Sequence, residues 1–132
     1  MAWAQTYPSR PVRLIVPFGA AGATDIVARL IGQYLSEKLG QQFVIENKPG
    51  ATNNIGTEQV VRAAADGYTL LLVNPANAVN ASLYEKLSFN FIRDIAPVAG
   101  FIRTPKPTQQ FSMLIHFRGP FVEGLGYQRE TF

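Results

Sequence analysis

The 132-residue chain contains no cysteine, which excludes disulfide bonds, thiol chemistry and cysteine-ligated metal sites. It also has no apolar run near the roughly 20 residues that a membrane-spanning helix requires. Lysine and arginine occur singly among acidic residues, so a net charge of +3 comes without the basic run that is typical of nucleic-acid binding. We therefore expect neither a transmembrane helix nor a nucleic-acid partner.

Groups that carry catalysis are missing as well. Glu37, Glu46, Glu58 and Glu85 fall on predicted helices or strand ends without forming an acid–base pair. No serine lies in a nucleophile elbow, and no cluster has the spacing of metal ligands. His116 is the only histidine and has no orienting partner near it in the sequence, which favours a structural or exposed role. These absences favour a binding protein over an enzyme, with no cofactor and no metal.

What is present is a globular composition, with 47% apolar and 16% charged residues, at a length that suits one domain. Near the start, Ala2-Trp3-Ala4 has the small-x-small form of a signal-peptidase site. Two interpretations stay open: a residual cleavage site of an exported protein, or chance in a chain rich in alanine. We favour export.

Apolar patterns predict alternating strands and helices as far as residue 103. We expect strands at residues 12–16, 43–46, 68–73 and 98–103, and helices at residues 26–39, 55–65 and 81–87. Short turns join these segments, which favours parallel strand pairing with right-handed crossovers. The expected fold class is therefore α/β, built on a parallel sheet.

The first helix has the clearest pattern. Thr24 is expected to cap it, Asp25 to lie in its first turn and Gly40 to end it in a left-handed conformation. Its apolar residues recur at helical spacing and predict one buried stripe of Ile26, Val27, Leu30, Ile31, Tyr34, Leu35 and Leu39. In the second helix we expect Val60, Val61 and Ala64 to point inward.

Residues 17–25, a turn of small residues between the first strand and the first helix, form the strongest candidate site. Unpaired amides and the helix dipole make such a turn an anion site. Its glycines, Gly19 and Gly22, fit neither the dinucleotide fingerprint nor the phosphate-binding loop. A purely structural explanation also stays open, because small residues let a strand and a helix pack closely. Asp25 could accept from a ligand or a bridging water, or could only stabilise the first helical turn.

Loops that follow parallel strands meet at one edge of a sheet, which places residues 17–24, 47–54 and 74–77 together. These loops are polar but offer mainly uncharged donors, so they would hold a carboxylate through oriented dipoles and water. The donors besides backbone amides are the side chains of Thr24, Thr52, Asn53, Asn54, Asn74 and Asn77.

The end of the chain differs from the rest. Residues 1–105 contain fifteen alanines and residues 106–132 contain none, while the same stretch holds four of the nine phenylalanines. A short strand is expected at residues 113–115, and later glycines and a proline break any longer pattern. This tail does not look like a continuation of the same fold.

Seven stretches together resemble the Bug family of extracytoplasmic solute-binding proteins, the TctC-type receptors of tripartite tricarboxylate transporters. They are residues 7–18, 22–25, 39–41, 44–51, 54–56, 66–71 and 94–98. The resemblance implies a periplasmic receptor with two α/β lobes of the type II flytrap fold, which close on a small carboxylate and work with membrane transporter subunits. In the family, loops from both lobes hold a ligand carboxylate, partly through bridging waters. Carried onto this sequence, the ligand-binding residues are Pro17, Phe18, Gly19, Ala20, Ala21, Gly22, Ala23, Thr24, Asp25, Thr52, Asn53, Asn74 and Asn77.

The resemblance runs from residue 7 to about residue 105, whereas family members have about 300 residues, a size that suits two domains. We therefore expect a cleavage region at residues 1–6, a first lobe at residues 7–105 and an atypical tail at residues 106–132, foreign or frameshifted, with most of the second lobe missing. Such a fragment should bind its carboxylate weakly. The alternative is an α/β fragment that self-associates through its exposed lobe surface and tail. A small enzyme or nucleotide-binding module is a third possibility, which the missing motifs disfavour.

Overall fold

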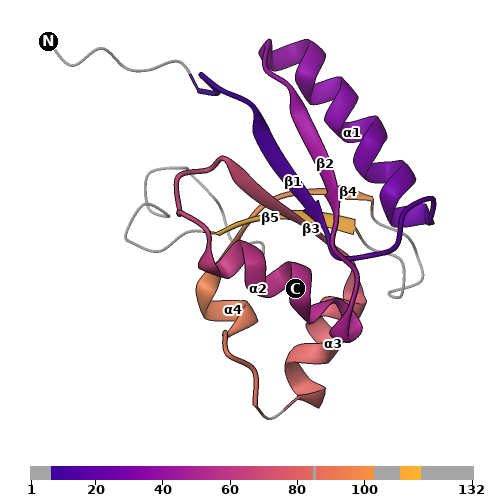
Figure 1. Cartoon of the computed structure of the whole chain (residues 1–132), viewed down its shortest axis with the longest axis vertical. Helices are drawn as coiled ribbons and strands as arrows, with labels where there is room; N and C mark the ends of the chain where they lie inside the picture. Colours follow the sequence, from indigo (N-terminus) through magenta and orange to yellow (C-terminus); the bar gives the residue numbers. More distant parts are fainter. Residues whose placement is uncertain (1–6, 85, 103–110, 117–132) are drawn as a thin grey trace, which may run out of the picture.

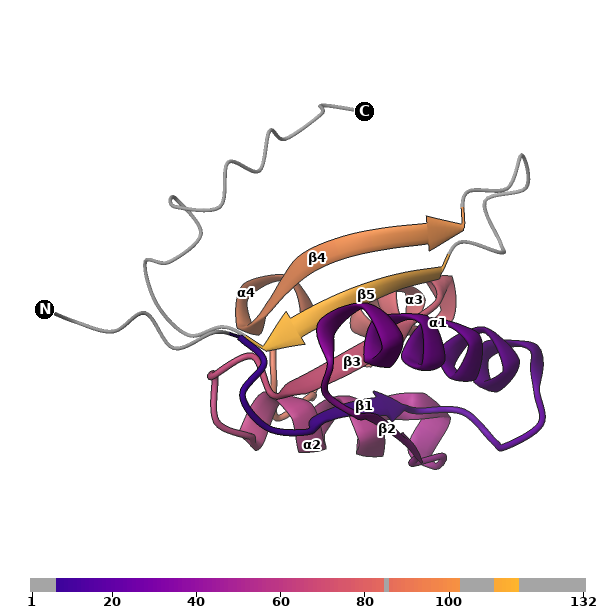
Figure 2. The ribbon, with the colours of Figure 1, turned by 90° about the horizontal axis from the view of Figure 1, so that it is seen from above.

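The computed structural model describes residues 7–84, 86–102 and 111–116, which form a sheet flanked by helices on both faces (Figures 1 and 2). In chain order the elements are β1 (Val12–Val16), α1 (Ala23–Leu39), β2 (Phe43–Asn47), the 3₁₀ turn η1 (Ala51–Asn53), α2 (Asn54–Arg62), β3 (Thr69–Val73), α3 (Pro75–Leu83), α4 (Phe91–Asp94), β4 (Ile95–Ile102) and β5 (Phe111–His116).

The sheet has the strand order β2-β1-β3-β5-β4. β1 pairs in parallel with β2 and with β3, which confirms the predicted α/β fold with a parallel sheet. β5 is antiparallel to both of its neighbours, β3 and β4. The short strand expected at residues 113–115 is thus confirmed, and it lies inside the sheet. The prediction that residues 106–132 form an atypical tail remains a prediction, because apart from β5 these residues lie outside the described part of the chain.

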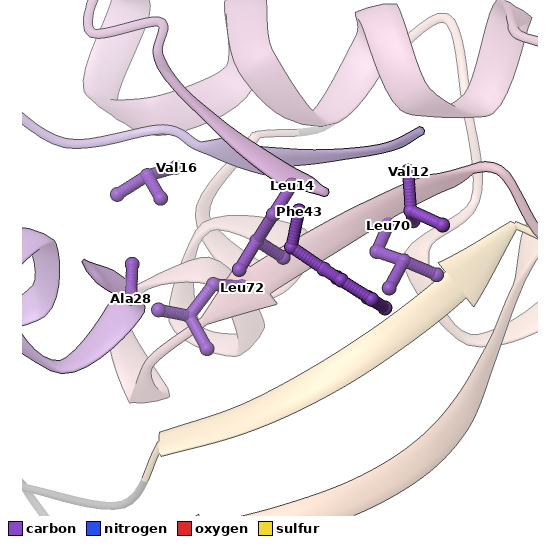
Figure 3. Packing of buried hydrophobic residues seen from close by; sticks show 7 residues of the cluster. All are labelled: Val12, Leu14, Val16, Ala28, Phe43, Leu70 and Leu72. Carbon is purple, nitrogen blue, oxygen red and sulfur yellow. The ribbon is translucent and has the colours of Figure 1, made fainter. Parts of the chain in front are cut away.

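Alternate residues of the strands are buried on opposite faces of the sheet. Val12, Leu14 and Val16 of β1 pack on the α1 side with Phe43, Leu70, Leu72 and Ala28 (Figure 3). Ile15 and Leu71 pack on the other side with Val60 of α2. Full burial of one such aliphatic side chain stabilises the fold by about 1.5–3 kcal/mol. The unbroken apolar runs of β1 and β3 are therefore explained by helices on both faces.

The predicted apolar stripe of α1 is only partly buried, which corrects the sequence-based expectation. The residues of α1 that are buried against the sheet include Ala28 and Gly32. A methyl group on Gly32 would lie 2.8 Å from the side chain of Ile45, so the helix packs too closely for larger residues there. The helix is rotated accordingly, and Ile26, Leu30, Tyr34 and Leu39 are left 42–64% exposed.

Helix starts also differ from the expectations. α1 begins at Ala23 with Gly22 as its N-cap, so Thr24 lies inside the helix and is not the cap. Its other end is as predicted, because Gly40 has φ 70° in the left-handed region. The predicted position of the third helix is wrong, because α3 covers Pro75–Leu83 instead of residues 81–87 and so begins six residues earlier. Asn74 and Asn77 form a capping box ahead of it, with Pro75 in the first turn, where proline's fixed φ suits a helix start.

The remaining differences are at element ends. α2 ends at Arg62, so Ala64 lies beyond it and is exposed, whereas Val60 is buried as predicted. β4 begins at Ile95, three residues before the predicted start, and Arg103 lies outside the described residues. His116 ends β5 opposite Ile95, and its side chain is outside the description. Among the described residues, no helix has the length and hydropathy to cross a membrane.

Candidate functional site

The carboxyl ends of β1, β2 and β3 meet at one edge of the sheet, as the parallel order requires (Figure 1). The predicted gathering of the three following loops is confirmed by the contacts between them. Asn47, at the end of β2, donates from Nδ2 to the carbonyl of Phe18 at 3.2 Å. Asn77 of α3 donates from Nδ2 to Oγ1 of Thr57 in α2 at 3.3 Å. Hydrogen bonds therefore join the first loop to the end of β2, and the start of α3 to α2, the helix that follows the second loop.

The N-terminus of α1 has no side-chain cap. Gly22 is the N-cap and has no side-chain acceptor, and the first-turn amides of Ala23, Thr24 and Asp25 lack intrahelical partners. The helix dipole adds about half a positive charge at this end. The preceding loop residues 19–23 are exposed, while Pro17 and Thr24 are buried behind them and Phe18 packs against the core. The first loop thus presents backbone donors and little else.

Asp25 is buried, and its two oxygens are bonded to donors of the chain itself. Oδ2 accepts from Nε of Arg29 at 3.0 Å and from the amide of Ala21 at 2.8 Å. Oδ1 accepts from Nδ2 of Asn47 at 3.0 Å. The hydrogen bond from Arg29, followed by the one from Ala21, lowers the pKa of Asp25 to about 2. Of the two roles considered, this geometry favours support of the loop and the first helical turn.

Asn47 and Arg29 are parts of this network that the sequence did not reveal. Arg29 also donates from Nη2 to Oδ1 of Asn47 at 3.3 Å, which orients the amide that holds Phe18 and Asp25. Ala21, whose amide binds Asp25, has φ 64°, a left-handed conformation that alanine rarely adopts. An asparagine directly after a strand was the one available signal for this contact.

The loop between β2 and α2 has the most unusual backbone of the described residues. Gly50, Ala51, Thr52 and Asn53 have φ values of 128°, 45°, 54° and 74° in succession. With Ala21, these are the only described non-glycine residues that have positive φ, and all lie in the two candidate loops. Asn53 is the N-cap of α2 but makes no side-chain cap bond. The amide of Asn54 donates to the carbonyl of Ala51, so the first-turn amides without an intrahelical partner are those of Ile55 and Gly56. Backbone strain of this kind concentrates at functional sites.

The third loop is different, because its predicted site residues serve α3 itself. Asn74 accepts from the amide of Ala76 at 2.9 Å, and Oδ1 of Asn77 accepts from the amide of Asn74 at 3.2 Å. The side chain of Asn77 is buried and engaged at both ends. Thr52, Asn53 and Asn54 are partly or fully exposed at the neighbouring loop. Within the described residues, no group of three acidic or histidine side chains could hold a metal ion.

This arrangement can hold an anion through backbone amides of two adjacent helix N-termini. It provides no acid–base pair and no nucleophile among the residues described above. A carboxylate suits the size and polarity of these backbone donors.

Known proteins are similar to this chain in sequence and in fold. Residues 27–109 match the model of the TctC family, described as "Tripartite tricarboxylate transporter family receptor". Protein BugT of Bordetella pertussis is 43% identical over 98 residues, which cover 73% of this chain and 30% of BugT. A solved periplasmic transporter is 43% identical with a TM-score of 0.68, over 72% of this chain and 32% of the other. MatC from Rhodopseudomonas palustris, solved with bound malate, is 38% identical with a TM-score of 0.67, over 71% and 32%.

The chain thus spans about a third of the length of each of these relatives. The match includes most of α1, all of α2 and α3, and the strands β2, β3 and β4. The observed α/β sheet agrees with that assignment. The chain belongs to the TctC family of tripartite tricarboxylate transporter receptors.

Proposed function

We propose that this chain forms the first-lobe part of a periplasmic receptor that binds a small carboxylate for uptake by tripartite transporter subunits in the membrane. The observation that carries the proposal is the pair of uncapped helix N-termini, α1 and α2, at one edge of the sheet. Family membership and the malate bound to MatC support a carboxylate as the ligand.

In the proposed site one carboxylate group accepts from the amides of residues Gly19 to Thr24, except that of Ala21, which binds Asp25, and from the amides of Ile55 and Gly56 at the start of α2. Thr52 and Asn53 border this second set of amides. Pro17 and Phe18 support the first loop from below, and Asn74 flanks it from the end of β3. Asp25 and Asn77 stabilise the loops through the bonds described above, so they would act through their neighbours.

Titration of the 132-residue chain with malate, followed by amide NMR shifts, tests this function. The expected dissociation constant is about millimolar or weaker, which is about 4 kcal/mol of binding or less. A single lobe leaves half of the ligand in water, and closure of a second lobe is what removes that water. Shifts should concentrate at Ala23 and Ile55, which lie in the first turns of α1 and α2.

A panel of other di- and tricarboxylates, acidic amino acids and aromatic acids, run in the same way, identifies the preferred class. Malonamide, which is neutral, is the control and should leave the amide shifts unchanged. Micromolar binding by monomeric chain, or shifts spread evenly over the surface, would contradict a half-site at the helix N-termini.

Self-association is the second candidate function, and one observation favours it. Ile26, Leu30 and Tyr34 of α1 form a row of exposed apolar side chains at helical spacing. Contiguous exposed apolar surface of this kind commonly marks an interaction site. The occupant that we propose is a second copy of the same chain.

A further inference from the structure

The η1 turn is held in its left-handed conformation by residues far away in the sequence. Thr52 has φ 54°, a left-handed conformation that β-branched residues rarely adopt. Its carbonyl oxygen accepts a hydrogen bond from Nδ2 of Asn80, and its Oγ1 lies 2.9 Å from the hydroxyl of Tyr84. Both partners come from α3 or its C-cap, 28 and 32 residues further along the chain.

A second contact holds the next residue of the turn. The carbonyl of Asn53 accepts from Oγ1 of Thr57 at 3.0 Å. Thr57 is buried, and its Oγ1 in turn accepts from Nδ2 of Asn77 at 3.3 Å. The carbonyls of Thr52 and Asn53, two residues with positive φ, are therefore both linked to α3. Thr52 is bonded directly and Asn53 through Thr57.

The three α3-side residues lie on one helical face. Positions 77, 80 and 84 follow the spacing i, i+3 and i+7, which places side chains in one row. Asn77 and Asn80 are 4% and 3% exposed. In Figure 1, α3 lies beside the start of α2, where η1 is located. Buried asparagines at two of these positions are not needed for packing alone, because an aliphatic residue would fill the same space without polar atoms to satisfy.

We propose that Asn77, Asn80 and Tyr84 are positioning residues for the η1 turn. Asn80 and Tyr84 bind Thr52 directly, and Asn77 binds Thr57, whose hydroxyl holds the carbonyl of Asn53. These bonds fix the turn and so aim the amides of Ile55 and Gly56 at the start of α2. The part that concerns ligand rests on the proposed function. None of the three residues touches the ligand. They act by holding the amides at the start of α2 in place, so that amides of α1 and of α2 donate to the same carboxylate.

The test uses ¹⁵N relaxation of the 132-residue chain without ligand, because order parameters at residues 51–53 report directly on the turn. Tyr84→Phe removes one hydroxyl, and Asn80→Asp replaces the donor amide with a group of the same shape that cannot donate. Ser82→Ala, an exposed polar residue of the same helix, is the matched control. In the parent chain we expect values near 0.85, typical of rigid backbone.

Both variants should lower the order parameters at residues 51–53 below about 0.6, with those of β1 unchanged. Ser82→Ala should change neither set. Unchanged values at residues 51–53 in Tyr84→Phe overturn the proposal. An equal loss of order in β1 and in the turn also overturns it, because the residues would then serve the fold as a whole. Tyr84→Phe removes only a partly exposed hydroxyl and keeps the test valid if Asn80→Asp does not fold.

Malate titration of the same variants tests the consequence for binding. We expect a dissociation constant about tenfold higher, the change that the loss of one hydrogen bond produces. The shifts at Ala23 should persist while those at Ile55 shrink, because only the amides at the start of α2 lose their position. If the parent chain shows no malate shifts, the proposed function fails, whereas the relaxation result still decides whether α3 positions the turn.

Discussion

At the scale of single residues, the site is defined by backbone conformations that the local sequence opposes. Ala21, Ala51, Thr52 and Asn53 all have positive φ. Sequence patterns located both loops correctly, because glycine, asparagine and proline mark turns. They could not predict left-handed alanine or threonine, since these conformations exist only where Asp25 or Asn80 holds them through tertiary contacts.

Asp25 provides a pH-dependent test at this scale. Its pKa is lowered from an ordinary value near 3.8 to about 2 in the folded chain, chiefly by the hydrogen bond from Arg29. A lowered folded-state pKa contributes stability above the unfolded value and loses it as the pH falls toward the folded value. Asp25→Asn should therefore reduce the free energy of unfolding by on the order of 2 kcal/mol near neutral pH.

The difference between the parent and Asp25→Asn should stay constant above pH ~5 and shrink between pH ~4 and ~2, measured by urea unfolding at each pH. Asp66→Asn is the control, because that carboxylate pairs with Arg10 at 2.7 Å on an exposed surface. Its effect should stay below about 1 kcal/mol. A constant difference down to pH ~2 would show that the ionised form of Asp25 is not what the network stabilises.

At the scale of elements, the helices at the ligand edge begin in two different ways. α1 and α2 have no side-chain cap, whereas α3 has a full capping box. Strands were predictable because burial imposes a strong apolar pattern on them, and the first helix because its apolar residues recur at helical spacing. The start of α3 was missed because Asn74 and Pro75 also mark turns, and the helix that follows has a mixed face of alanine and asparagine.

Gly22→Asp converts the start of α1 to a capped one and should move stability and binding in opposite directions. Gly22 has φ −79° and ψ 168°, which aspartate adopts readily, and a Cβ there would meet only the carbonyl of Gly19 at 3.5 Å. The new carboxylate would bind the first-turn amides and complement the helix dipole, which stabilises the chain by about 1 kcal/mol. The same carboxylate occupies the place of the ligand and should abolish malate shifts at Ala23.

Gly22→Ala separates the two effects, since it adds the Cβ without an acceptor. Its malate affinity should remain within about twofold of the parent, and its free energy of unfolding should change by less than ~1 kcal/mol. Thermal unfolding and NMR titration of the three chains give both quantities. Retained malate binding in Gly22→Asp would remove the amides of α1 from the proposed site.

At the scale of the whole molecule, the chain has two helices without a side-chain N-cap, α1 and α2, at one edge of its sheet. It also has an apolar stripe on α1 that is largely exposed. The family and the α/β fold were predicted correctly from the sequence, because both predictions depend on motifs and strand patterns that are spread over many residues. It wrongly predicted that the whole apolar stripe of α1 would be buried. Periodicity measures how apolar residues are spaced, but Gly32 and Ala28 determine which part of the helix faces the sheet.

That exposed stripe gives a prediction for the assembly. If two copies associate through α1, Leu30→Glu should shift the chain to monomer, because a charge in an apolar interface loses its water without gaining a partner. Light scattering at ~0.1–1 mM, with Glu37→Gln on the same helix as the control, measures the effect. A parent chain that is monomeric across this range would exclude self-association through this face.

The position of β5 in the sheet separates the order of synthesis from the order of assembly. Among the strands that the structure describes, β5 is the last in chain order, yet it lies between β3 and β4, and β4 pairs with no other of these strands. While the chain emerges from the ribosome, one edge of β3 stays unpaired until residues 111–116 have left the exit tunnel. An open strand edge readily pairs with other chains. Nascent chains that stall before residue 111 should therefore be the ones that need a holding chaperone, whereas longer ones can close the sheet by themselves.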